Sequence, residues 1–229
     1  MREIVLDTET TGLDPDSGHR VIEIGCVELV DHFPTGKSFQ RYLNPERDMP
    51  PDAQRIHGIS SEFLSDKPLF SHIAEEFLEF IADAPLVIHN ASFDLKFLNA
   101  ELARVSRKPL SNARAIDTVD IAKSKYPGSR YSLDELCRRF SIDLSGRSLH
   151  GALLDAELTA QVYIELTGGR QKKLLLSPAD EATVATSVEI RVVRVRPVPL
   201  VVLLNDAELG AHAAFVAKEL GQDAVWSWG

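Results

Sequence analysis

Two acidic side chains stand two residues apart at the end of the first apolar segment, in "IVLDTETTGLD" at residues 4–14. Successive side chains of a β-strand point to opposite faces, so Asp7 and Glu9 are expected to project together. Neighbouring carboxylates repel each other unless a cation or a shared proton lies between them. Oxygen ligands without Cys or paired His favour a hard cation such as Mg²⁺ or Mn²⁺. The pair alone is weak evidence, because solvated turns and helix caps use the same residue types.

Two later segments place further polar residues where strands and helices are expected to meet. In "VIHNASFDLKF", Asp94 lies just inside a helix that follows a short buried strand. In "LHGALLDAE", His150 comes immediately before the last strong helix and Asp155 lies in its second turn. Each has an ordinary explanation alone, since a helix dipole favours acids in the first turn and polar residues often begin helices. Because they all fall at strand ends or helix starts, the sequence predicts one shared site.

The elements that must position these residues follow from hydrophobic patterning. Strands are expected at residues 3–8, 20–30, 38–44 and 85–90, with the turn residues "DHFPTGK" joining the second strand to the third. Helical spacing predicts helices at residues 72–82, 93–105, 132–140 and 151–166, and Ser132 with Glu135 indicates a capping box. The segment "MPPDAQRIHGIS" is expected to form a polar loop. A meander followed by alternating helices and strands predicts an α/β fold with a sheet of mixed direction.

Composition bounds the class of protein. The 229 residues are 44% hydrophobic and carry a net charge of -9, which argues against coating nucleic acid by bulk electrostatics. Nine of the 25 basic residues nevertheless lie between Arg104 and Arg139, which indicates either a local phosphate contact or a solvated helix surface. No apolar run reaches the length of a membrane helix and no signal peptide is recognisable. With Cys26 and Cys137 expected as reduced core thiols, a cytoplasmic protein is predicted.

The composition changes at "TGGRQ", residues 167–171. The following "SPADEATVATS" has no apolar face and is predicted to be a linker. Beyond it, strand-like residues 188–204 precede a helix at 205–220, for which Asn205 and Glu208 form a capping box. A unit of about 35 residues is too small for a stable core of its own. We therefore expect it to dock on this chain or on a partner.

Three motifs, "LDTETTGL", "HNASFD" and "HGALLDAE", resemble those of the DEDD exonucleases, in the variant whose third motif carries His five residues before the last Asp. The similarity covers residues 1–168 and includes "HRVIEIG", "HGIS" and "SLDELC" between the motifs. It implies a ribonuclease-H-like fold, in which a mixed five-stranded sheet is flanked by helices.

The resemblance also implies a mechanism. Two divalent cations, Mg²⁺ or Mn²⁺, would lie about 4 Å apart. Asp7 would bridge them, Glu9 and Asp155 would complete the site on the nucleophile side, and Asp94 would support the second cation. His150 would take a proton from the attacking water, for which the ordinary histidine pKa of about 6.5 is suitable. The product would be a nucleoside 5′-monophosphate released from a 3′ end.

The same resemblance implies contacts with the terminal nucleotide. Its substrate-binding residues would include the acids Asp7, Glu9 and Asp155, the backbone of Thr10, Thr11 and Gly12, and the side chains of Leu13, Asp52 and His57. Leu13 would wedge against the base. His89 is either a further contact or a strand-end histidine satisfied by the backbone.

Within this family the chain is most similar to the proofreading subunits of bacterial replicative DNA polymerases, which act on single-stranded or frayed 3′ ends of DNA. Residues 169–176, "GRQKKLLL", would then bind the sliding clamp through Gln171, Leu174 and Leu176, although a frayed helix end has the same composition. Residues 177–187 would be a flexible linker, and 188–229 would dock on the catalytic (alpha) subunit of the polymerase. A related exoribonuclease that trims RNA ends and a non-catalytic adaptor between clamp and polymerase are the alternatives.

Overall fold

A computed structural model describes residues 1–146, 149–168 and 205–220. The chain divides into two units, Met1–Leu174 and Leu175–Gly229. The predicted clamp-binding peptide, the linker, residues 188–204 and the last residues of the docking segment all lie outside the described residues. Within the described ranges, no helix is both long and apolar enough to cross a membrane.

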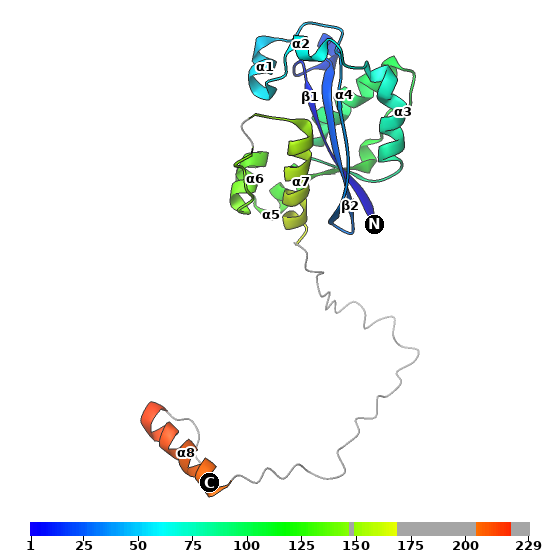
Figure 1. Cartoon of the computed structure of the whole chain (residues 1–229). Coiled ribbons are helices and arrows are strands. Elements are labelled where there is room, and N and C mark those ends of the chain that lie inside the picture. The colour runs from blue at the N-terminus through cyan, green and yellow to red at the C-terminus, as the bar shows by residue number, and fades with distance from the viewer. Residues whose placement is uncertain (147–148, 169–204, 221–229) are drawn as a thin grey trace, which may run out of the picture. The chain divides into compact units, whose positions relative to one another are not determined.

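The first unit is built on one mixed sheet with the strand order β3-β2-β1-β4-β5 (Figure 1). The antiparallel pairs are β1–β2 and β2–β3, and the parallel pairs are β1–β4 and β4–β5. The strands are β1 (Arg2–Thr10), β2 (Val21–Val30), β3 (Phe33–Tyr42), β4 (Leu86–Ile88) and β5 (Ala115–Asp117). This confirms the predicted α/β class and the five-stranded sheet of mixed direction.

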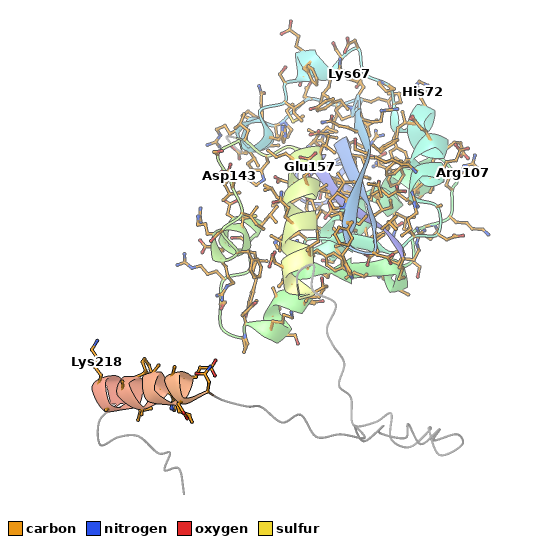
Figure 2. The ribbon with its side chains drawn as sticks, turned by 60° about the horizontal axis from the view of Figure 1, so that its bottom comes forward. Lys67, His72, Arg107, Asp143, Glu157 and Lys218 are labelled. Atoms are coloured by element: carbon orange, nitrogen blue, oxygen red, sulfur yellow. The ribbon has the colours of Figure 1, made fainter. Side chains whose placement is uncertain are left out.

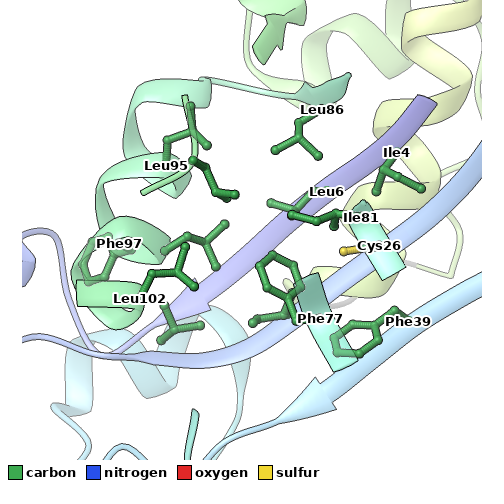
Figure 3. Close-up of a cluster of buried hydrophobic side chains, with 14 of the residues drawn as sticks. Ile4, Leu6, Cys26, Phe39, Phe77, Ile81, Leu86, Leu95, Phe97 and Leu102 are labelled. Carbon is green, nitrogen blue, oxygen red and sulfur yellow. The ribbon is translucent and has the colours of Figure 1, made fainter. Parts of the chain in front are cut away.

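Helices cover both faces of the sheet. They are α1 (Pro51–His57), α2 (Ser61–Leu64), α3 (Phe70–Ile81), α4 (Ala91–Arg104), α5 (Thr118–Lys125), α6 (Leu133–Arg139) and α7 (Ala152–Leu166). Ile4 and Leu6 of β1 point towards α3 and α4, where they join Phe77 and Leu102 in the main apolar cluster (Figure 3). Cys26 also belongs to this cluster, and both it and Cys137 are buried and free, as predicted.

The opposite face of the sheet carries α7. Val5, the residue between Ile4 and Leu6, packs there against Ala156 and Ala160. On its other side α7 packs against α5 and α6 (Figure 1), in a cluster that includes Leu136 and Leu158. The period-two alternation of β1 therefore divides its side chains between a face covered by α3 and α4 and a face covered by α7.

The hairpin turn predicted at "DHFPTGK" is shorter than expected. Only Asp31 and His32 form the turn, with φ of 51° and 67°, and β3 already begins at Phe33. Two residues with positive φ give a tight connection whose twist matches that of the flanking strands, so the strand resumes at once. Pro34 is tolerated because β3 lies at the edge of the sheet.

The predicted loop "MPPDAQRIHGIS" contains a helix, α1. Pro51 occupies a first-turn position and Gly58 ends the helix with φ of 74°, which are start and stop signals that the sequence contains. The helix was missed because it buries only Ala53 and His57 and so has no apolar period. Three further elements, α2, β5 and α5, had no predicted counterpart, because helices of four and eight residues and a strand of three carry little periodicity.

The predicted cap of α6 is present in part. The Ser132 hydroxyl accepts the backbone N–H of Glu135, but the Glu135 carboxylate accepts from Arg138. In the second unit, α8 (Asp206–Phe215) begins with the complete capping box of Asn205 and Glu208. A π-helical turn, Val216–Leu220, follows it and carries Lys218 (Figure 2). The helix predicted at 205–220 is thereby confirmed.

Candidate functional site

The first part of the site is the carboxyl end of β1. Since Val5 faces α7, alternation directs Asp7 and Glu9 to the same face. Glu9 is buried, and Asp7 lies opposite Gly25 of β2 in the antiparallel register. The two acids found in the sequence therefore meet the helix that carries the third motif.

Asp94 reaches the strand end from the first turn of α4 and is fixed there by Thr8. The Thr8 backbone N–H donates to Asp94 Oδ1 at 3.0 Å, and the Thr8 hydroxyl donates to the same oxygen at 2.7 Å. Both groups are buried. One side-chain oxygen of Asp94 is thus occupied by β1, and this anchors α4 to the strand between the two acids.

His150 and Asp155 come together across the start of α7. His150 Nδ1 lies 3.1 Å from Asp155 Oδ2, and Asp155 is buried while the His150 side chain is 47% exposed. The His150 backbone N–H also donates to the carbonyl of Ile56 in α1 at 3.2 Å. Ligand atoms of Glu9, His150 and Asp155 all lie within 4.8 Å of one another, a spacing that can hold a metal ion.

The electrostatics of the site favour a bound cation. Burial, followed by the charges of Asp94, Glu9 and Asp155, raises the pKa of Asp7 well above its ordinary value. Burial raises the pKa of Asp94 to about 7 although the hydrogen bonds from Thr8 act in the opposite direction. Carboxylates concentrated in a buried site are stabilised by a divalent ion, and oxygen donors suit Mg²⁺ and Mn²⁺. The donor set therefore fits the hard divalent cations expected from the sequence.

A pocket of about 570 Å³ opens beside these acids. It is lined by Thr8, Glu9, Thr10, Thr11, Gly12, Leu13, Asp14, Ser17, His19, Pro50, Asp52, Ala53, Ile56, His57 and Phe93. All of the residues predicted to contact the terminal nucleotide outside the metal cluster are in this lining. Leu13 and Asp52 are both exposed. Leu13 is apolar and 83% exposed, and the Asp52 carboxylate pairs with Arg55.

The ring of His57 lines this pocket, and its two nitrogens differ in their hydrogen bonding. Its Nδ1 accepts the backbone N–H of Ile59 at 3.0 Å, so the neutral ring carries its proton on Nε2. Nε2 is buried and has no hydrogen-bond partner among the described residues. Burial, with the nearby His150, lowers the pKa of His57 and keeps the ring neutral. A buried N–H without a partner is a site where a ligand can accept a hydrogen bond.

The backbone of Thr10–Gly12 is held by β2 and α4. The Thr11 N–H donates to the Arg20 carbonyl at 2.9 Å, and the Arg20 N–H donates to the Thr11 hydroxyl at 3.0 Å. The Arg20 guanidinium in turn donates to both oxygens of the buried Glu101, at 2.7 and 2.9 Å. The loop that follows the acids is therefore tied by a two-pronged ion pair to α4.

His89 lies on the other side of the acids. It lines a groove of about 600 Å³ together with Asp7, Asn90, Val119, Tyr131, Ser132, Leu133, Asp134, His150 and Asp155. Its Nδ1 lies 2.8 Å from the Thr118 hydroxyl. Both alternatives for His89, a contact with the substrate and a strand-end histidine satisfied within the fold, therefore stay open.

Several residues of the site were not found in the sequence. Thr8 was overlooked because nothing local marks a threonine whose partner lies 86 positions away. His19 lies against Gly12 so closely that a Cβ there would come within 2.4 Å of its ring. Phe93 packs against the main apolar cluster, as its helical spacing predicts, and it also lines the pocket. The glycine after two threonines could have signalled such a close approach.

Comparison with known proteins agrees with this geometry. A family model described as exonuclease (RNase_T) matches residues 4–163. The chain is 52% identical over 225 residues to the DNA polymerase III subunit epsilon of Rickettsia felis, covering 96% of this chain and 97% of that relative. It is 42% identical over 240 residues to the protein of the same name from Escherichia coli (strain K12), covering 98% and 97%.

Solved structures show the same fold. Exonuclease X in complex with 5′ overhanging duplex DNA aligns with a TM-score of 0.56 and 27% identity over 72% of this chain and 90% of that chain. The nuclease domain of 3′hExo, a DEDDh family member bound to rAMP, aligns with a TM-score of 0.64 and 21% identity over 75% and 94%. The chain therefore belongs to the exonuclease family and, within it, to the group of DNA polymerase III epsilon subunits.

Proposed function

We propose that this exonuclease removes mismatched nucleotides from the 3′ end of DNA, by metal-dependent hydrolysis, as the proofreading subunit of a bacterial replicative polymerase. The observation that carries the proposal is the convergence of Glu9, His150 and Asp155 within 4.8 Å beside a pocket of nucleotide size. These residues come from β1 and from the start of α7, which are far apart in the sequence.

Asp7, Glu9, Asp94 and Asp155 are the proposed holders of two divalent cations. When bound, such cations lower the pKa of the attacking water and stabilise the leaving 3′ oxygen. The carboxylates offer hard oxygen ligands, which suit both Mg²⁺ and Mn²⁺. The hydrogen bonds from Thr8 hold Asp94 in one orientation, which supports a fixed rather than an adaptable site.

His150 is the proposed general base. In the tautomer with the proton on Nδ1, that nitrogen donates to Asp155 Oδ2, and Nε2 is then in its acceptor form. A carboxylate partner of this kind orients the ring and stabilises the imidazolium that forms when a proton is taken up. The backbone hydrogen bond to Ile56 fixes the point from which the side chain extends.

The pocket is proposed to hold the terminal nucleotide. Backbone groups of Thr10–Gly12 would contact it, Leu13 would wedge against its base, and the buried Nε2–H of His57 would donate a hydrogen bond to it. Asp52, on the same helix as His57, would contact it from the exposed rim. Unpairing a mismatched end costs less free energy than unpairing a matched end. A site that accepts single strands therefore acts on mismatched ends preferentially.

The partners are proposed from the relatives. Since curated relatives that match nearly the whole chain are named as subunits of DNA polymerase III, we assign this chain to that assembly in the bacterial cytoplasm. Residues 188–229 would dock on its alpha subunit, residues 177–187 would be the tether, and Gln171, Leu174 and Leu176 would bind the sliding clamp. A tether raises the effective concentration of the nuclease at the polymerase to about the millimolar range.

Digestion of a labelled primer–template, with and without a 3′-terminal mismatch, tests the activity. In Mg²⁺ or Mn²⁺ we expect faster removal of the mismatched nucleotide and release of nucleoside 5′-monophosphates. Asp7→Ala with Glu9→Ala should abolish cleavage, whereas Asp83→Asn, an exposed acid, should not change it. Faster digestion of an RNA end than of a mismatched DNA end would replace this proposal by the exoribonuclease alternative.

A further inference from the structure

A fifth carboxylate lies next to the catalytic acids and has no role in the mechanism above. Glu23 of β2 is 1% exposed and is directly opposite Glu9 in the antiparallel register. Placing one more negative charge beside this acidic site raises the electrostatic cost of folding. The presence of Glu23 there therefore requires a compensating interaction.

The compensating interaction is with the start of α7. Glu23 Oε2 accepts the backbone N–H of Ala152, the first residue of that helix, at 3.1 Å. Glu23 Oε1 accepts from the Gln40 amide at 2.7 Å, so the carboxylate is held from both sides. The first backbone N–H groups of a helix have no partners within the helix, and its N-terminus carries partial positive charge.

The helix has no cap of its own at this end. Gly151 occupies the N-cap position and has no side chain to accept a hydrogen bond. An acceptor for α7 therefore comes from the neighbouring strand rather than from the chain just before the helix. Two positions along β2, Gly25 lets the helix backbone approach so closely that a Cβ there would lie 2.2 Å from Ala152 and Leu153 backbone atoms.

We propose that Glu23 is a positioning residue for the exonuclease reaction, which holds the start of α7 so that His150 and Asp155 meet Glu9. The inference rests on the proposed roles of these three residues. His150 precedes Ala152 by two positions and Asp155 follows it by three, so movement of the helix start displaces both. Glu23 touches neither substrate nor cation in this proposal and acts only through α7.

The matched pair Glu23→Met and Glu23→Gln tests the proposal. Both side chains are neutral and close to glutamate in size, but only Gln keeps an oxygen that can accept the Ala152 N–H. We expect Glu23→Met to lower kcat on a single-stranded DNA oligonucleotide by about 10–100-fold, with KM changed less than about threefold. Glu23→Gln should stay within about fivefold of the unchanged protein.

Calorimetric titration with Mn²⁺ alone gives a readout that does not depend on turnover. Glu23→Met should weaken Mn²⁺ binding by about tenfold, because Asp155 is displaced from Glu9, and Glu23→Gln should not. Glu28→Ala is the control, since Glu28 is a buried acid on the same strand whose polar partners are Arg2, Thr35 and Lys37 rather than the start of α7. It should lower stability but leave kcat and Mn²⁺ affinity unchanged.

The outcomes separate the two proposals. If the unchanged protein binds Mn²⁺ but does not degrade 3′ ends, the proposed function fails while the Mn²⁺ titrations still test Glu23. Equal kcat and equal Mn²⁺ affinity for the Met and Gln variants would overturn the role of Glu23. If Glu23→Met does not fold alone, the pair is compared in a Gly151→Ser background, where a Cβ meets no atom within 4 Å and a new N-cap stabilises the helix.

Discussion

The proposed metal-binding carboxylates of this exonuclease are held in place by specific hydrogen bonds. Asp94 comes from α4, on the face of the sheet opposite α7, and its bonds to Thr8 hold it at the strand end. Burial, followed by the charges of Asp94, Glu9 and Asp155, raises the pKa of Asp7, so these carboxylates favour a bound cation. Side chains that hold the proposed ligands are therefore expected to affect metal affinity as well.

Thr8→Val tests this anchoring at the residue scale. The substitution keeps the volume and the backbone N–H bond but removes the hydroxyl that donates to Asp94. We expect Mn²⁺ affinity and kcat to fall by about tenfold each, measured by calorimetry and by oligonucleotide digestion. Thr159→Val is the matched control, because Thr159 is fully buried and its hydroxyl has no partner in the described part of the chain. Equal losses in the two variants would refute the anchoring role.

Glu28 provides a pH-dependent prediction away from the metal site. Hydrogen bonds from Arg2 and then from Thr35 hold the pKa of this carboxyl below its ordinary value. A lowered folded-state pKa means that the stabilisation is complete above the unfolded pKa of about 4.3 and disappears as the pH falls through the folded value. In urea unfolding, the free energy of unfolding of Glu28→Gln should therefore be lower than that of the unchanged protein at pH 7. This difference should become smaller below pH 4. A difference in free energy of unfolding that does not change with pH would contradict this role of the Glu28 charge.

At the scale of elements, the site depends on how closely α7 approaches the sheet. Gly25 lies opposite Asp7, and the α7 backbone occupies the space where any other side chain would begin. We expect Gly25→Ala to lower the free energy of unfolding by about 2–4 kcal/mol and to weaken Mn²⁺ binding, because the helix must shift. Chemical denaturation and calorimetry measure both effects.

Gly146→Ala is the control for that substitution, because a Cβ at Gly146 meets nothing within 4 Å. Its free energy of unfolding should stay within about 0.5 kcal/mol of the unchanged protein. If Gly25→Ala behaves in the same way, the close contact between β2 and α7 is not required.

The sequence predicted those elements whose periodicity is strong and missed those that are short. Helix α3 has a clear apolar face and α7 is long and largely apolar, so both were placed within two residues of their bounds, whereas α1, which buries only Ala53 and His57, was not found. The acids and His150 were found because their motifs are local. Thr8 and Glu23 were not, since their partners lie 86 and 129 positions away and only folding brings them together.

On the scale of the whole molecule, catalysis and assembly are assigned to separate units. Every proposed catalytic and nucleotide-contacting residue lies between Asp7 and Asp155, within the first unit. Helix α8 of the second unit is exposed along its length, with Leu209 and Phe215 at 42% and 58% exposure. Within its own unit this helix leaves both apolar side chains uncovered, as suits a helix that binds another surface.

Truncation after Ser177 tests this division of labour. The shortened chain keeps the sheet, the helices on both of its faces and the four proposed metal-binding acids. Its kcat on free oligonucleotides should therefore stay within about twofold of that of the full chain, and its melting temperature should not fall. Its binding to the catalytic subunit of the polymerase, measured by surface plasmon resonance, should be lost.

Leu209→Ser with Phe215→Ser in the full chain should reproduce the loss of binding with the nuclease intact, because it removes apolar area worth about 25 cal/mol per Å². Undiminished binding of both variants would move the polymerase contact to the nuclease unit.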